Sequence, residues 1–351
     1  MTAQSENSHH PFQSLTPDVV LDALASVGLY GDGRLTALSS YENRVYLVHL
    51  ERGLDRDALA PSSVVVKFYR PGRWSDKQIE EEHEFSHELM QAEIPVVSPL
   101  ALNGQHLHHH AGFCFSVSPQ RGGRAPELDD FEVLEWIGRF LARIHTVGAA
   151  KPFVHRPALN VQSFGLASME WLLSHDMVPL DVQAQWREKC QTAINIIASQ
   201  AYFTLDTGQN YHDVAIIRLH GDCHPGNILW TPTEAVNGGP HFVDLDDARS
   251  GPAVQDLWML LSGDRRQRTT QLSALIDGYE QFRPFDRREL ALIEPLRTLR
   301  LIHYCAWLAR RWQDPIFPIN FPWFGSSDYW TSQIHMLDEQ IEAMQEEPLL
   351  V

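Results

Sequence analysis

Three polar residues in the C-terminal half of the chain have the types and the spacing that phosphoryl transfer needs. Asp222 and Asn227 lie in the string His-Gly-Asp-Cys-His-Pro-Gly-Asn, five positions apart, and Asp244 follows an apolar Phe-Val pair. In phosphoryl transfer a carboxylate orients the acceptor hydroxyl, while carboxylate and amide oxygens hold the Mg²⁺ that bridges the nucleotide phosphates. The pattern therefore predicts Asp222 as the catalytic base, and Asn227 and Asp244 as metal ligands.

The spacing of these residues is that of a kinase catalytic loop, in which H-R-D is followed by four residues and Asn. This chain reads His-Gly-Asp, and it has Val-Asp-Leu where a protein kinase has Asp-Phe-Gly. Aspartates are also common turn residues, but that interpretation leaves three simultaneous matches to chance. With these two differences from the protein kinase motifs, the pattern resembles the aminoglycoside phosphotransferase and choline kinase superfamily. That superfamily has a kinase-like fold with an H-G-D-x-x-x-x-N loop and a later D-x-D.

Kinase chemistry also needs a fixed cation near the nucleotide phosphates, and Lys67 is the candidate. It interrupts the run Val-Val-Val-Lys-Phe-Tyr, whose β-branched and aromatic residues predict a strand. A lone lysine in a strand is usually a charge on an edge strand. Within so apolar a run, a functional position is the better interpretation.

The helix after this strand should carry the carboxylate partner of Lys67. Ser75 and Gln78 form a capping-box pattern, and helix formers continue to about Glu93, before a proline. Glu82 shares a helical face with apolar residues three and seven positions later, so we predict that it pairs with Lys67. The alternatives are Glu80, Glu81 and Glu84. Most of this acidic cluster should be a solvated face.

The sequence contains no glycine-rich phosphate loop. Neither G-x-G-x-x-G nor G-x-x-x-x-G-K-[ST] occurs, so Rossmann and P-loop interpretations lose their support. One strand before Lys67 stands Ser-Ser-Tyr-Glu-Asn-Arg (39–44) instead. Side-chain donors such as Ser40 or Asn43 would then replace glycine backbone N–H groups at the phosphates. An ordinary polar hairpin is an equally good interpretation of this segment.

Longer strings resemble one branch of the superfamily, a bacterial serine/threonine protein kinase of the stress response. They cover nearly the whole chain and include Ser-Tyr-Glu-Asn-Arg-Val-Tyr (40–46), Val-Val-Lys-Phe-Tyr-Arg-Pro (65–71), His-Gly-Asp-Cys-His (220–224) and Phe-Val-Asp-Leu-Asp-Asp-Ala-Arg (242–249). The resemblance implies ATP and Mg²⁺ as cofactors, with Ser40 on the ATP side. It assigns Asp222 as proton acceptor, and Asn227 and Asp244 as Mg²⁺ ligands. It also implies that Asp256 accepts hydrogen bonds from the catalytic-loop backbone, although an exposed aspartate at a helix N-terminus is the alternative.

The patterns and the resemblance together predict an α+β, two-lobed protein kinase-like fold. Residues 1–117 should form a nucleotide-binding lobe, a small antiparallel sheet with one helix. A hairpin turn is expected at Asn103-Gly104, a closing strand at 112–117 and a hinge at 118–123. Residues 118–351 should form the larger, mainly helical catalytic and substrate lobe. Its best-marked helix runs from Phe131 to Gly148.

Composition limits the partners and the compartment. The chain has 351 residues and a formal net charge of −17, which argues against a nucleic-acid or anionic-membrane partner and leaves room for a cationic acceptor. The four cysteines make no C-x-x-C pair, as in a reducing compartment. No apolar run reaches about 18 residues, and no signal-peptide pattern begins the chain. We expect a cytoplasmic monomer.

A histidine cluster at 106–110 suggests a metal site. No carboxylate or cysteine stands beside it in the sequence, so a solvated loop is the favoured interpretation. The aromatic, proline-rich stretch 317–324 is too apolar for a linker and should pack on the second lobe.

Three functions remain to be distinguished. The first is an ATP- and Mg²⁺-dependent serine/threonine protein kinase that also phosphorylates itself. The second is a small-molecule kinase acting on choline, homoserine or a sugar. The third, a catalytically dead binding module, is the weakest because every catalytic position is filled. The catalytic residues cannot separate the first two, but the resemblance favours a protein substrate.

Overall fold

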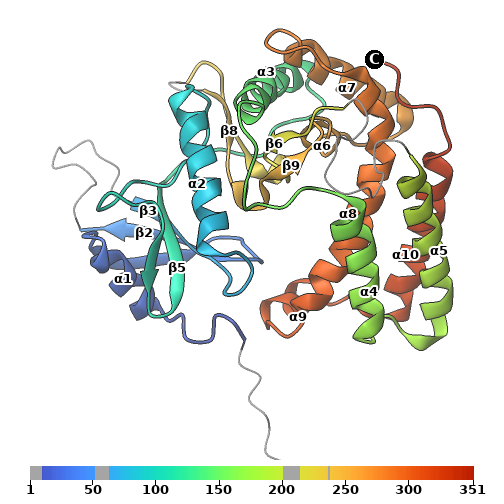
Figure 1. The fold of residues 1–351 in the computed structure, drawn as a ribbon. Helices are drawn as coiled ribbons and strands as arrows, with labels where there is room; N and C mark the ends of the chain where they lie inside the picture. The colour runs from blue at the N-terminus through green and yellow to red at the C-terminus, as the bar shows by residue number, and fades with distance from the viewer. Residues whose placement is uncertain (1–9, 52–62, 201–213, 236–237) are drawn as a thin grey trace, which may run out of the picture.

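The computed structural model describes residues 10–51, 63–200, 214–235 and 238–351, which form two lobes (Figure 1). The N-terminal lobe is a five-stranded antiparallel sheet of order β1-β2-β3-β5-β4 with two helices. Its elements are α1 (Pro17–Ser26), β1 (Gly31–Ala37), β2 (Arg44–Leu50), β3 (Ser63–Phe68), α2 (Asp76–Gln91), β4 (His108–His110) and β5 (Phe113–Pro119). The remainder is mainly helical, as predicted for this α+β fold. The expectation of one helix in the sheet lobe is wrong, because α1 is a second.

The core of this lobe lies between the sheet and α1. Val64, Val66 and Phe68 alternate along β3 and are fully buried against helix residues that include Leu24. Lys67 therefore points to the opposite face of the sheet. Since β3 pairs with both β2 and β5, Lys67 is not a charge on an edge strand.

The last two strands differ from the sequence-based expectation. The predicted turn at Asn103-Gly104 is present with positive φ at both residues, but only one bridge, between Leu102 and Gln105, flanks it. The histidine strand β4 forms the edge of the sheet instead, and β5 is internal. The predictions that 112–117 closes the sheet and that the histidines form a loop are therefore wrong.

Helices surround the short strands of the second lobe (Figure 1). Its elements are α3 (Phe131–Gly148), the π-helical turn η1 (Gln162–Leu166), α4 (Ala167–Ser174), α5 (Leu180–Ser199), β6 (Ile217–Leu219), η3 (Pro225–Asn227), β7 (Ile228–Thr231), β8 (Gly239–Phe242), η4 (Leu245–Asp247), β9 (Arg249–Gly251), α6 (Gln255–Trp258), α7 (Arg265–Tyr279), η5 (Arg287–Leu292), α8 (Ile293–Arg310), α9 (Ile316–Asn320) and α10 (Ser327–Ala343). None of the helices in the described ranges combines the length and apolarity needed to span a bilayer.

Helix α3 has the predicted bounds, and its apolar stripe is buried in the main core. Gly148 does not end it as a left-handed cap, because the residue after it is still in the right-handed helical region. The glycine is needed for another reason. A Cβ there would lie 2.1 Å from the carbonyl oxygen of Arg218 on β6. Gly148 therefore lets α3 approach the strand that leads into the catalytic loop.

Two short antiparallel strand pairs bring the acidic motifs together. Strand β6 pairs with β9, and β7 pairs with β8 with Ile228 opposite Phe242. Asn227 directly precedes β7, and Asp244 follows β8 by two residues. The backbone N–H of Val243 also donates to the carbonyl of Asn227 at 3.0 Å. Residues distant in sequence thus meet at one end of the β7–β8 hairpin.

Candidate active site

The loop that carries Asp222 is fixed from beneath by a buried carboxylate. Asp256 is fully buried, and it accepts the backbone N–H groups of His220 at 2.9 Å and Gly221 at 2.8 Å. His145 on α3 contacts the same carboxylate at 3.0 Å. These bonds satisfy a group whose burial would otherwise be costly. The predicted bracing role of Asp256 is confirmed, and the exposed alternative is excluded.

His220 joins the two motifs directly. Its Nε2 lies 2.9 Å from the carbonyl oxygen of Val243, the residue before Asp244, and donates to it. Gly221 has a φ of +84°, and a Cβ on it would lie 2.2 Å from the carbonyl oxygen of Asp247. The glycine in His-Gly-Asp is therefore required both by the backbone conformation and by the close approach of the second motif.

Asp222 faces a cleft of about 940 Å³ between the lobes. Its Oδ1 lies 2.7 Å from the guanidinium of Arg300, and its Oδ2 lies 3.5 Å from Nε2 of His224. Burial by itself would raise the pKa of Asp222, but the hydrogen bond to His224 and the charge of Arg300 outweigh burial and lower the pKa. The carboxylate is therefore ionised and can accept a hydrogen bond from an acceptor hydroxyl.

Asn227 and Asp244 line the same cleft and have oxygens suited to a hard cation. Asn227 uses its amide N–H to donate to the carbonyl of Asp222 at 2.9 Å, which leaves its side-chain oxygen as a ligand. Asp244 is half-exposed, with 49% of its side-chain surface accessible. The donor set fits Mg²⁺, which takes one or two carboxylates together with nucleotide phosphates.

Lys67 contacts two aspartates of the second motif. Its Nζ lies 2.7 Å from Asp244 and 3.4 Å from Asp246. Burial lowers the pKa of Lys67, but Asp244, Asp246 and then Glu82 more than compensate, so the pKa lies well above its usual range. The ammonium is thus fixed and charged beside the proposed metal ligand.

Glu82 lies on the inner face of α2, as predicted, but its carboxylate does not contact Lys67. It is 5% exposed, and its ion-pair partner is Arg156 at 3.7 Å. Burial raises the pKa of Glu82 to about 7, although Lys67 is close enough to lower it in part. The expected pairing therefore differs from the structure because Asp244 and Asp246 take the ammonium. The alternative Glu81 and Glu84 bind backbone N–H groups of 154–156 and Lys151 instead.

The segment before β2 supplies one side chain to the cleft and one to the scaffold. Ser40 lines the cavity. Asn43 is buried, and its amide donates to Asp246 at 3.1 Å while its oxygen accepts the backbone N–H of Arg70. Since the amide of Asn43 is already used, Ser40 is the better candidate for a phosphate donor, and this role remains a prediction.

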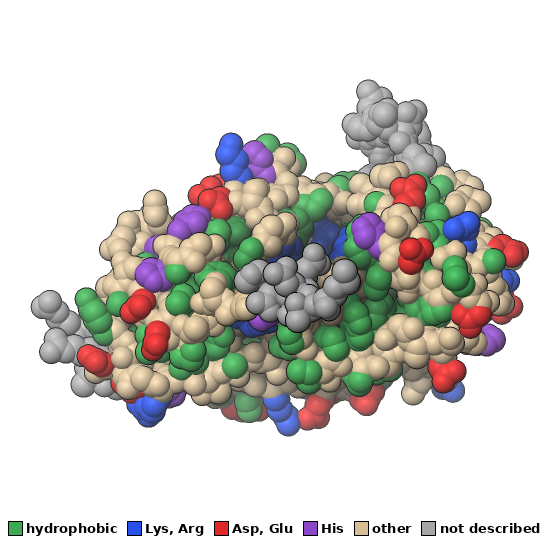
Figure 2. Space-filling model, turned by 90° about the horizontal axis from the view of Figure 1, so that it is seen from below, with side chains coloured by type: hydrophobic (Ala, Val, Ile, Leu, Met, Phe, Trp, Pro, Cys, Tyr) green, Lys and Arg blue, Asp and Glu red, His purple; other side chains and the backbone are tan. Residues whose placement is uncertain are grey.

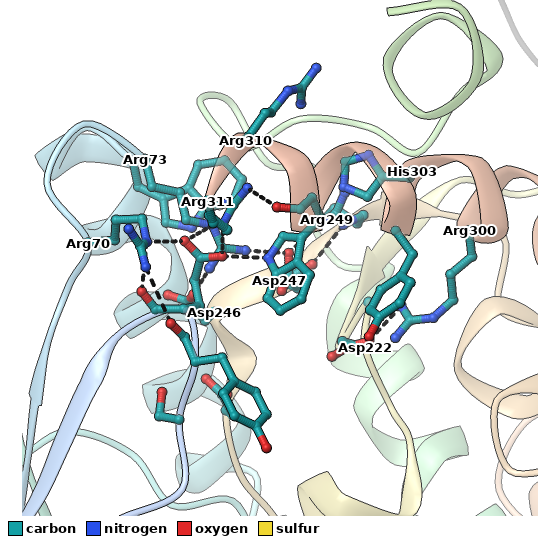
Figure 3. A pocket seen from close by; sticks show the side chains of 18 of the residues that line it. Arg70, Arg73, Asp222, Asp246, Asp247, Arg249, Arg300, His303, Arg310 and Arg311 are labelled. Carbon is teal, nitrogen blue, oxygen red and sulfur yellow. Dashed lines mark hydrogen bonds and ion pairs between the residues drawn. The ribbon is translucent and has the colours of Figure 1, made fainter. Parts of the chain in front are cut away.

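Sequence reasoning did not identify the cations around the second motif. Arg73 forms ion pairs with Asp246 and, at 2.8 Å, with Asp247. Arg156 donates to the backbone carbonyls of Asp246 and, at 2.6 Å, Ala248. The negative charge of Asp246 is therefore balanced by neighbouring cations, and its role is structural. In Figure 3 Arg73 lies beside Asp246 and Arg300 extends to Asp222. No spacing signal in the sequence indicates contacts over such separations.

One histidine of the 106–110 cluster does have carboxylate and cysteine neighbours. His109 Nε2 lies 3.0 Å from Asp76 at the start of α2, and Cys114 Sγ lies 3.5 Å from the same carboxylate. Sequence proximity missed this grouping because the three residues belong to different elements. Burial, with the Asp76 charge, raises the pKa of Cys114 to about 11. The trio lies outside the cleft that Asp222 faces.

The fold and this arrangement define a kinase-like phosphotransferase. A braced carboxylate faces a cleft, beside two side chains whose oxygens suit a metal ion and a lysine that is only 16% exposed. Residues 34–293 match the phosphotransferase enzyme family known as APH, so the chain belongs to that family.

Relatives of known name match almost the full length. The chain is 45% identical over 343 residues to stress response kinase A of Escherichia coli (strain K12), covering 98% of each protein. It is 44% identical over 338 residues to serine/threonine protein kinase RdoA of Salmonella typhimurium (strain LT2), covering 96% of each. The chain is accordingly an enzyme that phosphorylates.

Solved structures share the fold at low identity. Amicoumacin kinase hAmiN, in complex with AMP-PNP, Ca²⁺ and Ami, is 20% identical with a TM-score of 0.68, covering 95% of this chain and 94% of that one. A microcompartment-associated aminopropanol kinase is 15% identical with a TM-score of 0.63, covering 92% and 95%. The kinase-like fold predicted from the sequence is thereby confirmed.

Proposed function

We propose that this protein transfers the γ-phosphoryl group of ATP, with Mg²⁺, to serine or threonine hydroxyls of proteins, including its own. The observation that carries the proposal is the convergence of Asp222, Asn227 and Asp244 on one cleft of about 940 Å³. The relative named as a serine/threonine protein kinase, which matches over 96% of both chains, supports a protein acceptor.

In this reaction the acceptor oxygen forms a bond to the γ-phosphorus as the bond to the β,γ-bridging oxygen breaks, releasing ADP. Asp222 orients the hydroxyl and takes its proton. Asn227 and Asp244 would hold Mg²⁺, which when bound supplies charge neutralisation at the phosphates. Lys67 keeps Asp244 in place, and Ser40 would donate its hydroxyl to a phosphate.

The test is incubation of the purified protein with γ-labelled ATP and Mg²⁺, alone, with serine- and threonine-containing peptides, and with hydroxyl metabolites. We expect label on the chain itself and on peptides. Asp222→Asn should reduce transfer about 10²–10⁴-fold, the usual effect of a positioned base, while Mg·ATP affinity stays near that of the wild type. Near-normal turnover by Asp222→Asn would remove this residue from the mechanism. Label on metabolites alone would favour a small-molecule kinase.

A further inference from the structure

One face of α8 forms a cationic and aromatic wall of the cleft. The residues of this wall follow helical spacing and all line the cavity: Arg300, His303, Tyr304, Trp307, Arg310 and Arg311. The stripe contains no acidic residue, although the chain has a net charge of −17. Seen from below, the hollow between the lobes shows Lys or Arg side chains at its visible floor (Figure 2). Such a face must either neutralise nearby acids or bind an anion.

Part of this charge neutralises acids of the cleft. Arg311 and Arg70 pair with Glu42. Arg73 pairs with both Asp246 and Asp247. The other carboxylates among the described residues that line the cavity belong to Asp222 and Asp244, and these already pair with Arg300 and Lys67. A cationic acceptor would therefore find no spare carboxylate to bind it.

Two arginines of α8 remain available to a ligand. Arg300 is 36% exposed, and the carboxylate it contacts is Asp222, the proposed base. Arg310 is exposed, and its contacts are the carbonyl of Ala167 at 3.5 Å and the ring of Trp171. In Figure 3 Arg300 points to Asp222, and Arg310 points away from the other labelled side chains. One guanidinium thus lies beside the proposed base, with which it is paired. Another, whose contacts include no carboxylate, lies farther along the wall.

The histidine between them adds no positive charge. Burial, together with the cation of Arg249, lowers the pKa of His303 to about 3. Its ring stacks on Phe164 with centroids 4.1 Å apart. The wall therefore offers two guanidinium groups separated by a neutral, largely aromatic surface.

We propose that the acceptor bears an anionic group next to its hydroxyl, and that it is a serine or threonine flanked by acidic side chains. Arg300 would bind the carboxylate nearest the hydroxyl, and Arg310 one farther along the peptide. Guanidinium groups suit this role because their donors match carboxylate geometry. The inference rests on the proposed phosphotransfer to proteins, and it replaces the cationic acceptor for which net charge alone left room.

The experiment compares matched serine peptides whose flanking residues are acidic, neutral or basic, with free anionic and cationic hydroxyl compounds as further acceptors. For each, kcat/KM is measured, together with the KM for ATP. The wild type should prefer the acidic to the neutral peptide by about 10–100-fold, the effect of one or two hydrogen bonds to charged groups. Arg310→Gln should remove about 10-fold of that preference, and Arg310→Glu should reverse it toward basic peptides.

Because Arg300 contacts the proposed base, two variants of it are compared, one that removes the positive charge and one that keeps it. Arg300→Gln should lose the acidic preference, whereas Arg300→Lys should keep part of it. The matched control is Arg297→Gln, one turn away on α8. Arg297 does not line the cavity and pairs with Glu294, which Arg268 also contacts at 3.0 Å. This control should keep the preference of the wild type.

The outcomes separate the inference from the proposed function. Peptide transfer with no acidic preference, or an Arg300→Gln effect confined to the KM for ATP, overturns the anionic acceptor and leaves the protein kinase. Arginine-dependent transfer only to free anionic hydroxyl compounds supports the anion site and overturns the protein acceptor. Transfer only to cationic compounds, or to no anionic acceptor at all, overturns the inference.

Discussion

At Asp244 the backbone and the side chain impose separate requirements. The residue has φ 59° and ψ 63°, in the left-handed region where Asn and Asp are the most frequent residues after glycine. Its carboxylate meets Lys67 and is a proposed metal ligand. A substitution that keeps the backbone preference and removes the charge can therefore separate folding from metal binding.

Asp244→Asn should weaken Mg·ATP binding by at least about 10-fold, because a carboxylate is a stronger Mg²⁺ ligand than an amide. The melting temperature without ligand should change little, since Asn accepts the same backbone conformation and Lys67 keeps its contact with Asp246. Calorimetric titration with ATP, with and without Mg²⁺, measures both affinities. An unchanged affinity for Mg·ATP would contradict the assignment of Asp244.

Gly221 provides a second prediction at the scale of one residue. Gly221→Ala adds a Cβ at a φ of +84°, only 2.2 Å from the carbonyl oxygen of Asp247. Gly112 has the same φ, but a Cβ there meets nothing within 4 Å. Gly112→Ala should therefore cost only the left-handed backbone term, about 1–2 kcal/mol.

Gly221→Ala should cost more than this control, because the loop must also shift, and it should reduce transfer. Urea unfolding of both variants, with a transfer assay, compares them directly. Equal losses of unfolding free energy in Gly221→Ala and Gly112→Ala would show that the contact with Asp247 has no energetic effect.

At the scale of elements, the catalytic loop depends on the segment that starts α6. Glu289 on η5 is 3% exposed and accepts the backbone N–H of Val254 at 2.8 Å. Two residues later Asp256 binds the backbone of the catalytic loop. Burial raises the pKa of Glu289 from 4.5 to about 7. The support of the loop therefore includes a group that titrates near neutrality.

The pH dependence has a definite sign. Between pH 4.5 and 7 the folded protein keeps a proton on Glu289 that the unfolded chain has lost, so the unfolding free energy falls as pH rises. The total effect is about 3.5 kcal/mol, from about 2.5 pKa units at 1.4 kcal/mol per unit. Glu289→Gln should flatten this part of the curve measured by urea unfolding at pH 5 to 8. Glu346→Gln, at an exposed position, should keep the wild-type curve; parallel curves for Glu289→Gln and wild type would exclude the effect.

Elements whose signals are local could be predicted from the sequence. The capping box of Ser75 and Gln78 and the 3.6-residue periodicity of α3 act over a few positions, and both are present in the structure. Helix α1 was missed, although Thr16 caps it and Pro17 begins it. Its short apolar stripe is stabilised by the sheet, and that contact has no local signature.

The same distinction holds in the site. The motif spacing identifies Asp222 and Asn227 because they share one short loop. The partner of Lys67 could not be identified by spacing, because Asp244 lies 177 residues away in the sequence. Only the fold brings the two side chains together. The arginines of α8 could have been found by helical spacing, since positions 300, 303, 304, 307, 310 and 311 share one face. The contact of Arg300 with Asp222 could not be predicted in this way.

At the scale of the whole molecule, one buried aspartate connects the lobes. Asp314 lies between α8 and α9. Its carboxylate accepts hydrogen bonds from the guanidinium groups of Arg44 on β2, at 2.8 Å, and Arg70, at 2.7 Å. Nearby, Glu42 accepts the indole N–H of Trp307 at 2.6 Å. Any opening of the cleft between the 39–44 segment and α8 must therefore separate desolvated charges.

Asp314→Asn should destabilise the protein by about 3 kcal/mol, because it leaves two arginines without their shared carboxylate while only 2% of the Asp314 side chain is exposed. It should also loosen the closed arrangement, which small-angle scattering would detect as a larger radius of gyration at unchanged oligomeric state. Urea unfolding gives the free energy, with the exposed Glu346→Gln as the control expected to change little. If Asp314→Asn matches the wild type in both measurements, the lobes are held together by the packing of α2 on the second lobe, where Phe85 and Leu89 are buried in its core.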